Sequence, residues 1–587
     1  MKILMCVVLL SAIATGGIVL GVETEPVMLT DFSVCTPRSA LATKPEFRHW
    51  QMIEYQADGV SGKMLGAKGL IEAPDVTLPM KIKGWHKIYI AYWNPLFEFG
   101  IPREMVLKLK LTGDPCFQRI LQVEVGEPAE QTHPGRTSLV EVFWRAEDLT
   151  GKSLSIGKFK GRRAYIAYVK LVPMSPEEVA GVKQERESWT DGRRLVGTID
   201  GTAFQKYFYS VPTEEDLREW VEVYRYSTVG KIVWAVSYGD WVNYPSKFGK
   251  LLTDIPTYGD MSDNIYSQTI VPAQRALLAK GIAYHDIIAD HLHSMGIKFD
   301  IMIRPSIQRG PLEDVGGWMD EHPEFRMRHG DGSPIEKLSY AFPEVRNFQL
   351  AIIREAAERF DIDGVNVAFV RLNQTFGDGE QPLVDAVRAK YGDGPWTKDQ
   401  MNKVKEEFLI QLMRDARKVL DEVGKKKGKR LELSALVWSW AGPGRAYSPT
   451  FNVDYRTMMK EKLLDSVIIH QGAGVNDEDI AIAHANGCKY VLYPDAREAD
   501  LAKILIDGYA KGLDGAADWD INDPRFVGPD YNRQYKYIRS SGDPEKLNTV
   551  LASPPPDEAE KKLITIHKIN GKSVSGKDLW NACYAGG

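Results

Sequence analysis

The chain is poor in cysteine, with 5 residues among 587. Cys6 lies in an apolar N-terminal segment, and the other four are too few and too widely spaced for a disulfide scaffold or a zinc site: Cys35, Cys116, Cys488 and Cys583. We therefore expect no bound metal. Cys35 and Cys116 have two alternatives, a disulfide in an oxidising compartment or two separate buried thiols, because sequence spacing does not fix the distance between their Cα atoms.

The chain also lacks a large excess of charge and the motifs that bind phosphate. Its net charge is -5, with 26% charged and 44% hydrophobic residues, which is ordinary for a globular protein and gives no sign of a nucleic-acid partner. No glycine-rich phosphate loop, Rossmann fingerprint or Gly-x-Ser-x-Gly elbow occurs in a strand–turn–helix context. These absences argue against nucleotide cofactors and serine-hydrolase chemistry, and we expect no cofactor.

One apolar run has the length of an export signal. Lys2 gives the chain a basic start, the stretch from Ile3 to Leu20 is apolar, and polar residues follow from Glu23. This pattern predicts a signal peptide over residues 1–21 and a periplasmic or extracellular protein without membrane attachment after its removal. A membrane anchor is the alternative, but serine, threonine and glycine residues make the run weakly apolar.

The length exceeds the roughly 250 to 300 residues at which single cores stop growing, so two or more domains are expected. Short alternating segments separated by turn pairs predict an antiparallel β-sandwich over residues 24–175, which by analogy could bind carbohydrate. A charged helical linker over 176–192 follows. A barrel over 193–545 precedes a tail, 546–587, whose one strand, Leu563 to Ile569, is expected to dock on the sandwich or the barrel.

The region from 193 to 545 alternates apolar strand-like runs with helix-like stretches, which predicts an α/β fold of the (β/α)8 barrel type. The expected strands are Arg194 to Gly201, Lys231 to Asp240, Lys298 to Arg304, Gly364 to Arg371, Glu432 to Trp440, Ser466 to Gln471, Lys489 to Asp495 and Gly515 to Asp520. In such barrels the active site is built at the C-terminal ends of the strands. Residues at those ends are therefore the candidates for chemistry.

One stretch carries linked motifs. The run Pro343-Glu344-Val345-Arg346 opens a helix, and the run Asp363-Gly364-Val365-Asn366-Val367-Ala368-Phe369-Val370-Arg371 forms the following strand. Upstream lie His322-Pro323-Glu324-Phe325-Arg326 and Asp331-Gly332. Together these motifs resemble the glycosyl-hydrolase-like family 10 barrels over roughly residues 193 to 545. The resemblance implies a secreted barrel that acts on polysaccharide.

The sequence departs from that family at the fourth strand. Asn366 and Ala368 occupy the positions that the family gives to His and Asp. Either other carboxylates do the work, or the barrel binds glycans without cleaving them.

Glycoside hydrolysis needs one protonated and one ionised carboxyl group near the scissile bond. Asp495 ends the seventh strand, where many retaining barrel glycosidases place a nucleophile, and Glu380 lies on the loop after the fourth strand as the candidate general acid. Asp200 and Asp520 complete the catalytic candidates. The alternatives are a helix N-cap for Asp495 and a solvated loop carboxylate for Glu380.

Other strand-end residues are candidates for substrate binding because arginine holds hydroxyl or carboxylate groups and aromatic rings stack on sugars. They are Arg304, Arg371, Asp240, Trp438, Trp440, His470, Gln471 and Tyr238. For Arg304 the alternative is a buried partner for Asp300, and for Trp438 and His470 it is a structural place in the core.

A histidine-rich segment invites a metal interpretation, which the spacing does not favour. His285, Asp286, Asp290, His291 and His293 lie on a helical pattern without a pair of histidines at i, i+4. A solvated helix face is the preferred interpretation.

We therefore hypothesise a secreted glycoside hydrolase whose partner is a carbohydrate polymer or oligosaccharide. The alternative from another class is a glycan-binding barrel without catalysis, motivated by Ala368. A third possibility is a lyase acting on uronate polymers, in which arginine neutralises the carboxylate.

Overall fold

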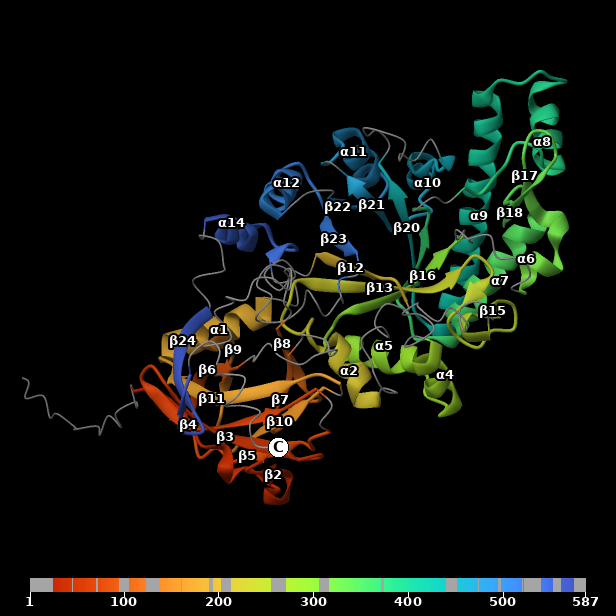
Figure 1. Cartoon of the computed structure of the whole chain (residues 1–587). Coiled ribbons are helices and arrows are strands. Elements are labelled where there is room, and N and C mark those ends of the chain that lie inside the picture. Colours follow the sequence, from red (N-terminus) through yellow and green to blue (C-terminus); the bar gives the residue numbers. More distant parts are fainter. Residues whose placement is uncertain are drawn as a thin grey trace, which may run out of the picture.

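The structure is a computed structural model with two parts side by side, a smaller all-β region and a larger barrel (Figure 1). It describes residues 25–44, 46–69, 72–93, 105–122, 138–159, 161–188, 194–201, 213–254, 271–305, 316–370, 374–439, 451–472, 474–494, 498–519, 521, 540–552 and 561–574. The segment expected to be a signal peptide lies outside these residues. Within them, no helix combines the length and apolar composition needed to cross a membrane.

The N-terminal region is made of short antiparallel strands, as the alternating pattern predicts. They are β1 (Val27–Leu29), β2 (Leu41–Ala42), β3 (Trp50–Ala57), β4 (Val60–Ala67), β5 (Val76–Leu78), β6 (Trp85–Tyr92), β7 (Met105–Leu111), β8 (Gln118–Gln122), β9 (Ser138–Asp148), β10 (Leu154–Lys158) and β11 (Ala164–Pro173). Helix α1 (Pro176–Ser188) follows them. Strands β5, β10, β7 and β8 form one sheet, and the others belong to a second.

The second sheet is completed by the far end of the chain. Strand β24 (Lys561–Ile569), followed by β25 (Lys572–Ser573), pairs with β9 and with β3. Six strands thereby pair in a closed cycle in the order β3, β4, β11, β6, β9, β24. In Figure 1 blue β24 runs beside the red and orange strands. The C-terminal strand is therefore part of the N-terminal region.

Two hydrophobic clusters fill this region. The first lies within the closed cycle and draws on each of its strands: Ile53, Met64, Tyr165, Ala91, Leu139 and Ile564. The second joins the cycle to the four-stranded sheet, with Ile90 and Ile166 from one and Leu109 and Ile156 from the other. A closed cycle with a sheet packed against it is a more complex arrangement than the two-sheet sandwich expected from the sequence.

The tryptophans of this region are mostly core residues. Trp50, Trp93 and Trp144 are buried, and Trp85 is partly exposed. This placement indicates that most of them fill the core and are not presented to a sugar at the surface.

The second part is a closed barrel of eight parallel strands, which confirms the prediction. The strands are β12 (Leu195–Ile199), β13 (Val229–Tyr238), β16 (Lys298–Arg304), β19 (Gly364–Ala368), β20 (Glu432–Trp438), β21 (Ser466–Gly472), β22 (Lys489–Pro494) and β23 (Gly515–Trp519). Each pairs with the next in that order, and β23 pairs with β12 to close the ring. All eight expected runs overlap these strands, because strands buried on both faces give short hydrophobic runs.

Several helices surround the barrel. They are α2 (Glu214–Glu222), α4 (Val271–Ala279), α5 (Tyr284–Ser294), α6 (Trp318–Glu321), α7 (Pro343–Arg359), α8 (Gln381–Tyr391), α9 (Lys398–Lys427), α10 (Tyr455–Lys460), α11 (Asp477–Ala485), α12 (Glu498–Ala510) and α14 (Pro544–Ala552). Thr213 and Asp216 form a capping box at α2, and Pro343 occupies the first turn of α7.

The loops at the barrel's C-terminal end contain short strands. Strands β14 (Trp241–Val242) and β15 (Lys250–Leu251) extend the barrel sheet after β13, and β17 (Arg326–Arg328) with β18 (Pro334–Leu338) form a hairpin after β16. The hairpin lies beside α8 at the upper right of Figure 1.

A buried ion network occupies the N-terminal half of the barrel. Lys231 donates to Asp300 at 2.7 Å and also to Glu432, which Lys298 contacts from outside. Burial raises the pKa of Asp300 to about 6 against the pull of Lys231. Burial acts in the same direction on Glu432, but the two lysines outweigh it and lower the pKa of Glu432 to about 2. The partner of Asp300 is therefore Lys231 and not Arg304.

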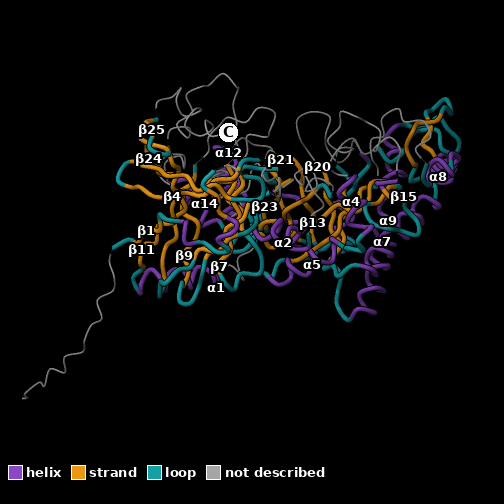
Figure 2. The backbone as a smooth tube through the Cα atoms, turned by 60° about the horizontal axis from the view of Figure 1, so that its bottom comes forward, coloured by secondary structure: helices purple, strands orange, loops and turns teal. Residues whose placement is uncertain are grey.

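The interface between the two parts of the molecule contains both ion pairs and apolar contacts. Glu219 on α2 is fully buried and pairs with Lys108 at 2.6 Å and Arg119 at 3.2 Å, both from the four-stranded sheet. Val106 and Phe159 from the same region belong to the barrel's main hydrophobic cluster. Figure 2 shows the two parts adjoining along this side.

The described cysteines Cys35, Cys116 and Cys488 are buried free thiols. Of the two alternatives for Cys35 and Cys116, the structure therefore contains separate thiols. Burial raises the pKa of Cys35 to about 12 and that of Cys116 further still, so neither resembles a reactive cysteine. Cys583 lies outside the described residues.

Candidate active site

The C-terminal ends of the barrel strands bring a set of polar and aromatic side chains together. Side chains alternate along a strand, so a residue two places beyond an interior residue faces the interior as well. Met302, Leu436, Ile468, Val491 and Ala517 belong to the interior cluster. The next inward positions are Arg304, Trp438, His470, Tyr493 and Trp519, and with Asp200 and Tyr238 they form what we call the mouth cluster.

Arg304 is the charged centre of the mouth cluster. Its side chain is 8% exposed and donates from Nη1 to Oδ1 of Asp200 at 3.1 Å, and the Asp200 side chain is 19% exposed. The guanidinium carbon lies 5.6 Å from the ring centre of Tyr238 and 5.9 Å from that of Trp519. Among the described residues, none hydrogen bonds to Nε of Arg304. Asp200 therefore balances the charge of the guanidinium at the mouth.

His470 joins the aromatic side of the cluster. Its ring centre lies 4.8 Å from Trp438, 5.1 Å from Tyr493 and 5.5 Å from Trp519. Trp438 also stacks at 6.5 Å on Phe451, which follows the loop after β20. The C-terminal ends of four neighbouring strands, β20 to β23, thus present a continuous aromatic surface beside the Arg304–Asp200 pair. Trp438, Tyr493 and Trp519 are only partly buried.

Asp240 lies on the turn after β13 and has a structural contact. It is buried, and its Oδ2 accepts the backbone N–H of Met319 at 2.9 Å. Gly317 approaches so closely that a Cβ there would lie 2.8 Å from the same oxygen. The carboxylate therefore ties the β13 turn to the start of α6. Burial, with a smaller contribution from Asp240, raises the pKa of the nearby Tyr340 well above its usual value.

Glu380 lies at the start of α8, away from the mouth cluster's contacts. It is fully buried, and its Oε1 accepts the backbone N–H groups of Gly377 at 2.6 Å and Arg328 at 3.4 Å. Its Oε2 has no hydrogen-bond partner among the described residues. This environment differs from the solvated loop that is the sequence alternative. It places Glu380 between the loop after β19 and the hairpin of β17 and β18.

The fourth strand supplies no carboxylate inside the barrel. Asn366 donates from Nδ2 to Oγ of Ser434 at 2.8 Å, and Ala368 is fully buried in the interior cluster. The departure from the family pattern therefore leaves a small apolar side chain where a catalytic aspartate is expected.

Several candidates cannot be placed. Asp495, Asp520, Arg371 and Trp440 lie outside the described residues, and the side chain of Gln471 at the end of β21 is likewise not described. In sequence, Asp495 follows Pro494, the last residue of β22, and Asp520 follows Trp519, the last residue of β23. Their catalytic roles, like that of Glu380, stay predictions.

Sequence reasoning missed Tyr493 and Trp519. Ala517 faces the barrel interior, so the period-two rule already indicates that Trp519 faces inward and Asp518 does not. Applying that rule to each strand end would have found both aromatic residues.

The histidine-rich helix α5 is not simply a solvated face. His285 is fully buried, between Tyr284 at 3.8 Å and Phe360 at 4.9 Å, and burial lowers its pKa to about 3. His293 pairs with Asp363 at 2.9 Å. The expectation of a solvated face is wrong for His285 and His291, because both point into packed interfaces.

Comparison with known proteins leaves the family open. No family model matches the chain, and no curated protein does. Among solved structures, α-L-fucosidase isoenzyme 2 from Paenibacillus thiaminolyticus aligns over 61% of this chain and 49% of its own, at 13% identity and a TM-score of 0.36. The PgaB (BpsB) glycoside hydrolase domain from Bordetella bronchiseptica aligns over 59% of this chain and 99% of its own, at 13% identity and a TM-score of 0.37.

A third similar structure is the GH20 exo-β-N-acetylglucosaminidase from Vibrio harveyi, which aligns over 68% of this chain and 50% of its own, at 12% identity and a TM-score of 0.32. The chain thus spans about half the length of the fucosidase and of the acetylglucosaminidase. Identities and TM-scores this low assign neither a family nor an activity. The evidence for function is the arrangement of the side chains at the barrel mouth.

Proposed function

We propose that the protein is a glycoside hydrolase that acts on a polysaccharide or oligosaccharide. The observation that carries the proposal is the mouth cluster, in which the Asp200 carboxylate, paired with Arg304, adjoins a surface of aromatic rings at the C-terminal end of a (β/α)8 barrel. Active sites of such barrels are built at this end. Aromatic faces suit the apolar faces of sugar rings, and a guanidinium suits their hydroxyl oxygens.

The proposal assigns the two carboxyl groups that the reaction requires to Asp200 and Asp495. Asp200 is held by Arg304, which fixes the orientation of its Oδ1 and leaves the carboxylate partly exposed at the mouth. In sequence, Asp495 follows Pro494, the last residue of β22, and that strand also carries Tyr493, a neighbour of His470. One group would protonate the leaving oxygen, and the other would attack the sugar or activate water. Asp520, beyond Trp519, is the reserve for either role.

Glu380 enters the proposal as the alternative acid. Its burial and its two backbone donors favour a structural role at the hairpin, but its Oε2, which has no hydrogen-bond partner in the described part of the chain, leaves room for another function. Export is a further part of the proposal, supported by the basic start and apolar run of residues 1–21. An exported hydrolase would meet polysaccharide outside the cytoplasm.

The second candidate function is glycan binding without hydrolysis. The observation in its favour is the buried Ala368 on β19, where the resembling family has a carboxylate. In this case the aromatic surface and Arg304 would bind sugar, and Asp200 would serve only to balance Arg304. Binding without release of reducing sugar is its expected result.

The test is turnover on a panel of polysaccharides by wild type, Asp200→Asn and Asp495→Asn. Each substitution should lower kcat on the order of 10²- to 10⁴-fold, because each removes one acid or base. The matched control is Asp393→Asn, which also removes an arginine-bound aspartate, that of Arg388, but on the connection between α8 and α9. Thermal unfolding of every variant separates lost chemistry from lost fold.

Near-normal turnover in both variants would discard the assignment of Asp200 and Asp495. If Glu380→Gln alone abolished turnover without lowering the unfolding temperature, the acid would be Glu380. Ultraviolet-absorbing unsaturated products would identify the uronate lyase instead. For a hydrolase, the anomer first released, read by NMR, reports whether the two carboxylates act by retention or inversion.

A further inference from the structure

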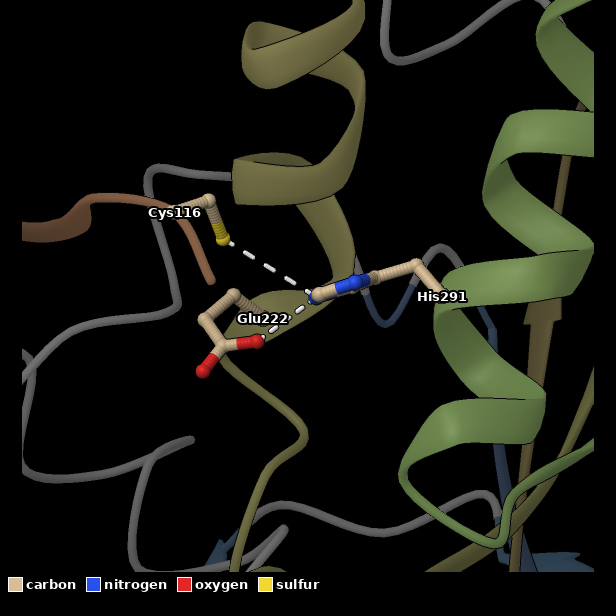
Figure 3. A group of neighbouring side chains, drawn as sticks. All are labelled: Cys116, Glu222 and His291. Carbon is tan, nitrogen blue, oxygen red and sulfur yellow. Dashed lines mark hydrogen bonds and ion pairs between the residues drawn. The ribbon is translucent and has the colours of Figure 1, made fainter. Parts of the chain in front are cut away.

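Three buried side chains meet where the N-terminal region joins the barrel (Figure 3). Cys116 comes from the connection between β7 and β8, Glu222 is the last residue of α2, and His291 lies on α5. Their burial shows that none belongs to a solvated face. The sequence separates them by up to 175 residues, so neither cysteine spacing nor the histidine pattern of α5 could bring the three together.

The ligand atoms of the three side chains point to a common position. Nε2 of His291 lies 2.7 Å from Oε2 of Glu222 and 3.9 Å from Sγ of Cys116. All three ligand atoms lie within 4.8 Å of one another. Bond lengths of about 2.0 Å to nitrogen or oxygen and 2.3 Å to sulfur in a tetrahedral site separate the ligand atoms by roughly 3.3 to 3.6 Å. Side-chain rotations that move each ligand atom by well under 1 Å would bring the atoms to these separations.

The donor set has the chemistry of a zinc site. Thiolate, imidazole and carboxylate are the three ligand types that zinc takes from proteins. Arg225 contacts both oxygens of the Glu222 carboxylate, donating from Nε to Oε1 and from Nη2 to Oε2 at 2.9 Å. Such an outer partner orients a ligating carboxylate. A thiol sulfur is a weak hydrogen-bond acceptor, so a contact of 3.9 Å from Nε2 of His291 contributes little by itself.

We propose that Cys116, Glu222 and His291 bind a zinc ion that fastens the N-terminal region to the barrel. This site is separate from the mouth cluster and does not depend on the proposed glycosidase activity. The three protein ligands leave the fourth position of a tetrahedral ion to water. The ion's role is structural, because its ligands come from both parts of the molecule and binding would stabilise their docking.

Binding of the zinc ion releases one proton. The Cys116 S–H bond breaks, an S–Zn bond forms, and the proton leaves to the solvent. The neutral imidazole of His291 keeps its single proton, which moves to Nδ1 so that the Nε2 lone pair binds the metal. Glu222 exchanges a hydrogen bond from Nε2 for a bond from Oε2 to zinc. No oxidant, reductant or other reactant is required.

The experiment uses the full chain, treated with a chelator and then titrated with Co²⁺ and with Zn²⁺. We expect one equivalent of either ion to bind, an absorption band from thiolate-to-cobalt charge transfer to appear in the near ultraviolet, and Zn²⁺ to displace it. Zinc should also raise the unfolding temperature. Cys116→Ser should lose the band and weaken binding by at least the roughly 10- to 100-fold that loss of an outer-shell partner costs.

The matched control is Cys488→Ser, which removes another buried free thiol, in the barrel. It should bind both ions as wild type does. Absence of stoichiometric metal in wild type, or wild-type binding by Cys116→Ser, would overturn the proposal in favour of a purely hydrogen-bonded cluster. If Cys116→Ser does not fold, X-ray absorption of the zinc-loaded wild type decides: one sulfur neighbour supports the site, and none refutes it.

Discussion

Lys231 shows how one residue can set the pH response of a barrel. Its ammonium group lies inside the N-terminal half, between the carboxylates of Asp300 and Glu432. Removing a single partner from such a network leaves a charge buried without compensation. The two carboxylates nevertheless respond in opposite directions, since the pKa of Asp300 is raised to about 6 and that of Glu432 is lowered to about 2.

We predict that Glu432→Gln removes an acid-sensitive part of the stability. The pKa of Glu432 is about 2 in the folded protein and near the ordinary glutamate value of 4.5 when unfolded. Its stabilisation is therefore complete above pH 4.5 and is lost as the pH falls towards 2. Urea unfolding at pH 5 should show Glu432→Gln to be less stable than wild type by on the order of 2 to 3 kcal/mol.

The difference between the two proteins should shrink as the pH is lowered to about 2.5. Asp300 is present in both proteins, but its response does not cancel, because the charge of Glu432 helps to raise the pKa of Asp300 and the substitution removes that charge. A stability difference that does not depend on pH would show that Glu432 contributes by packing and not by its charge.

The positions of some candidate residues could be predicted from the sequence, and those of others could not. Asp200 and Arg304 end strands on inward-facing positions, so their presence at the mouth follows from alternation alone. Glu380 and Asp240 could not be placed, because backbone N–H groups of Arg328 and Met319 decide their surroundings. Contacts with a backbone far along the chain leave no mark on the side-chain pattern.

At the scale of elements, the hairpin of β17 and β18 is held by a glycine-containing turn. Gly377 and Gly379 pass so close to the hairpin that a Cβ on them would lie 2.0 Å from the carbonyl oxygen of Arg328 and 2.1 Å from that of His329. Glu380 completes the contact by accepting two backbone N–H groups. The turn and the hairpin therefore behave as one packed unit beside α8.

We predict that Gly379→Ala lowers stability and loosens this unit. The added methyl group overlaps a backbone oxygen that cannot rotate away, and overpacking of this kind costs about 1 to 3 kcal/mol. The measurements are urea unfolding and the rate of proteolysis within residues 326–338. Gly330→Ala on the same hairpin is the control, since no atom lies within 4 Å of the added carbon. Equal behaviour of the two variants would contradict the close packing.

Elements of the barrel were predictable for a physical reason that does not extend to the N-terminal region. Strands buried on both faces and helices with local caps carry their signals within a few residues. The partners of an antiparallel strand are set by tertiary packing. For this reason the segment Leu563 to Ile569 could be recognised as a strand, while its place between β9 and β3 could not.

At the scale of the whole molecule, the chain leaves the N-terminal sheet, builds the barrel and returns. The barrel is therefore inserted between β11 and β24 of one closed cycle of strands. The interior of that cycle includes Ile564, Ile566 and Ile569 from β24. A domain boundary at residue 175 consequently does not enclose a complete folding unit.

We predict that a chain ending at residue 552 has a destabilised N-terminal region. Loss of β24 exposes the apolar interior of the cycle and leaves backbone groups of β3 and β9 unpaired. Limited proteolysis should cut within residues 50–173 much faster than in a control chain ending at residue 574, which keeps β24 and β25. Equal resistance of the two chains would show that the cycle is stable while open.

The pairing of β24 with the N-terminal strands also determines how the molecule would respond to mechanical force. Tension applied at residue 25 and at residue 574 enters the sheet through β1, which pairs with β11, and through β24, which pairs with β3 and β9. These pairings join the start and the end of the chain. The barrel lies within the loop that they close and feels no pull until they rupture. In a single-molecule stretching experiment the small region would therefore yield first, and the barrel would be mechanically shielded until then.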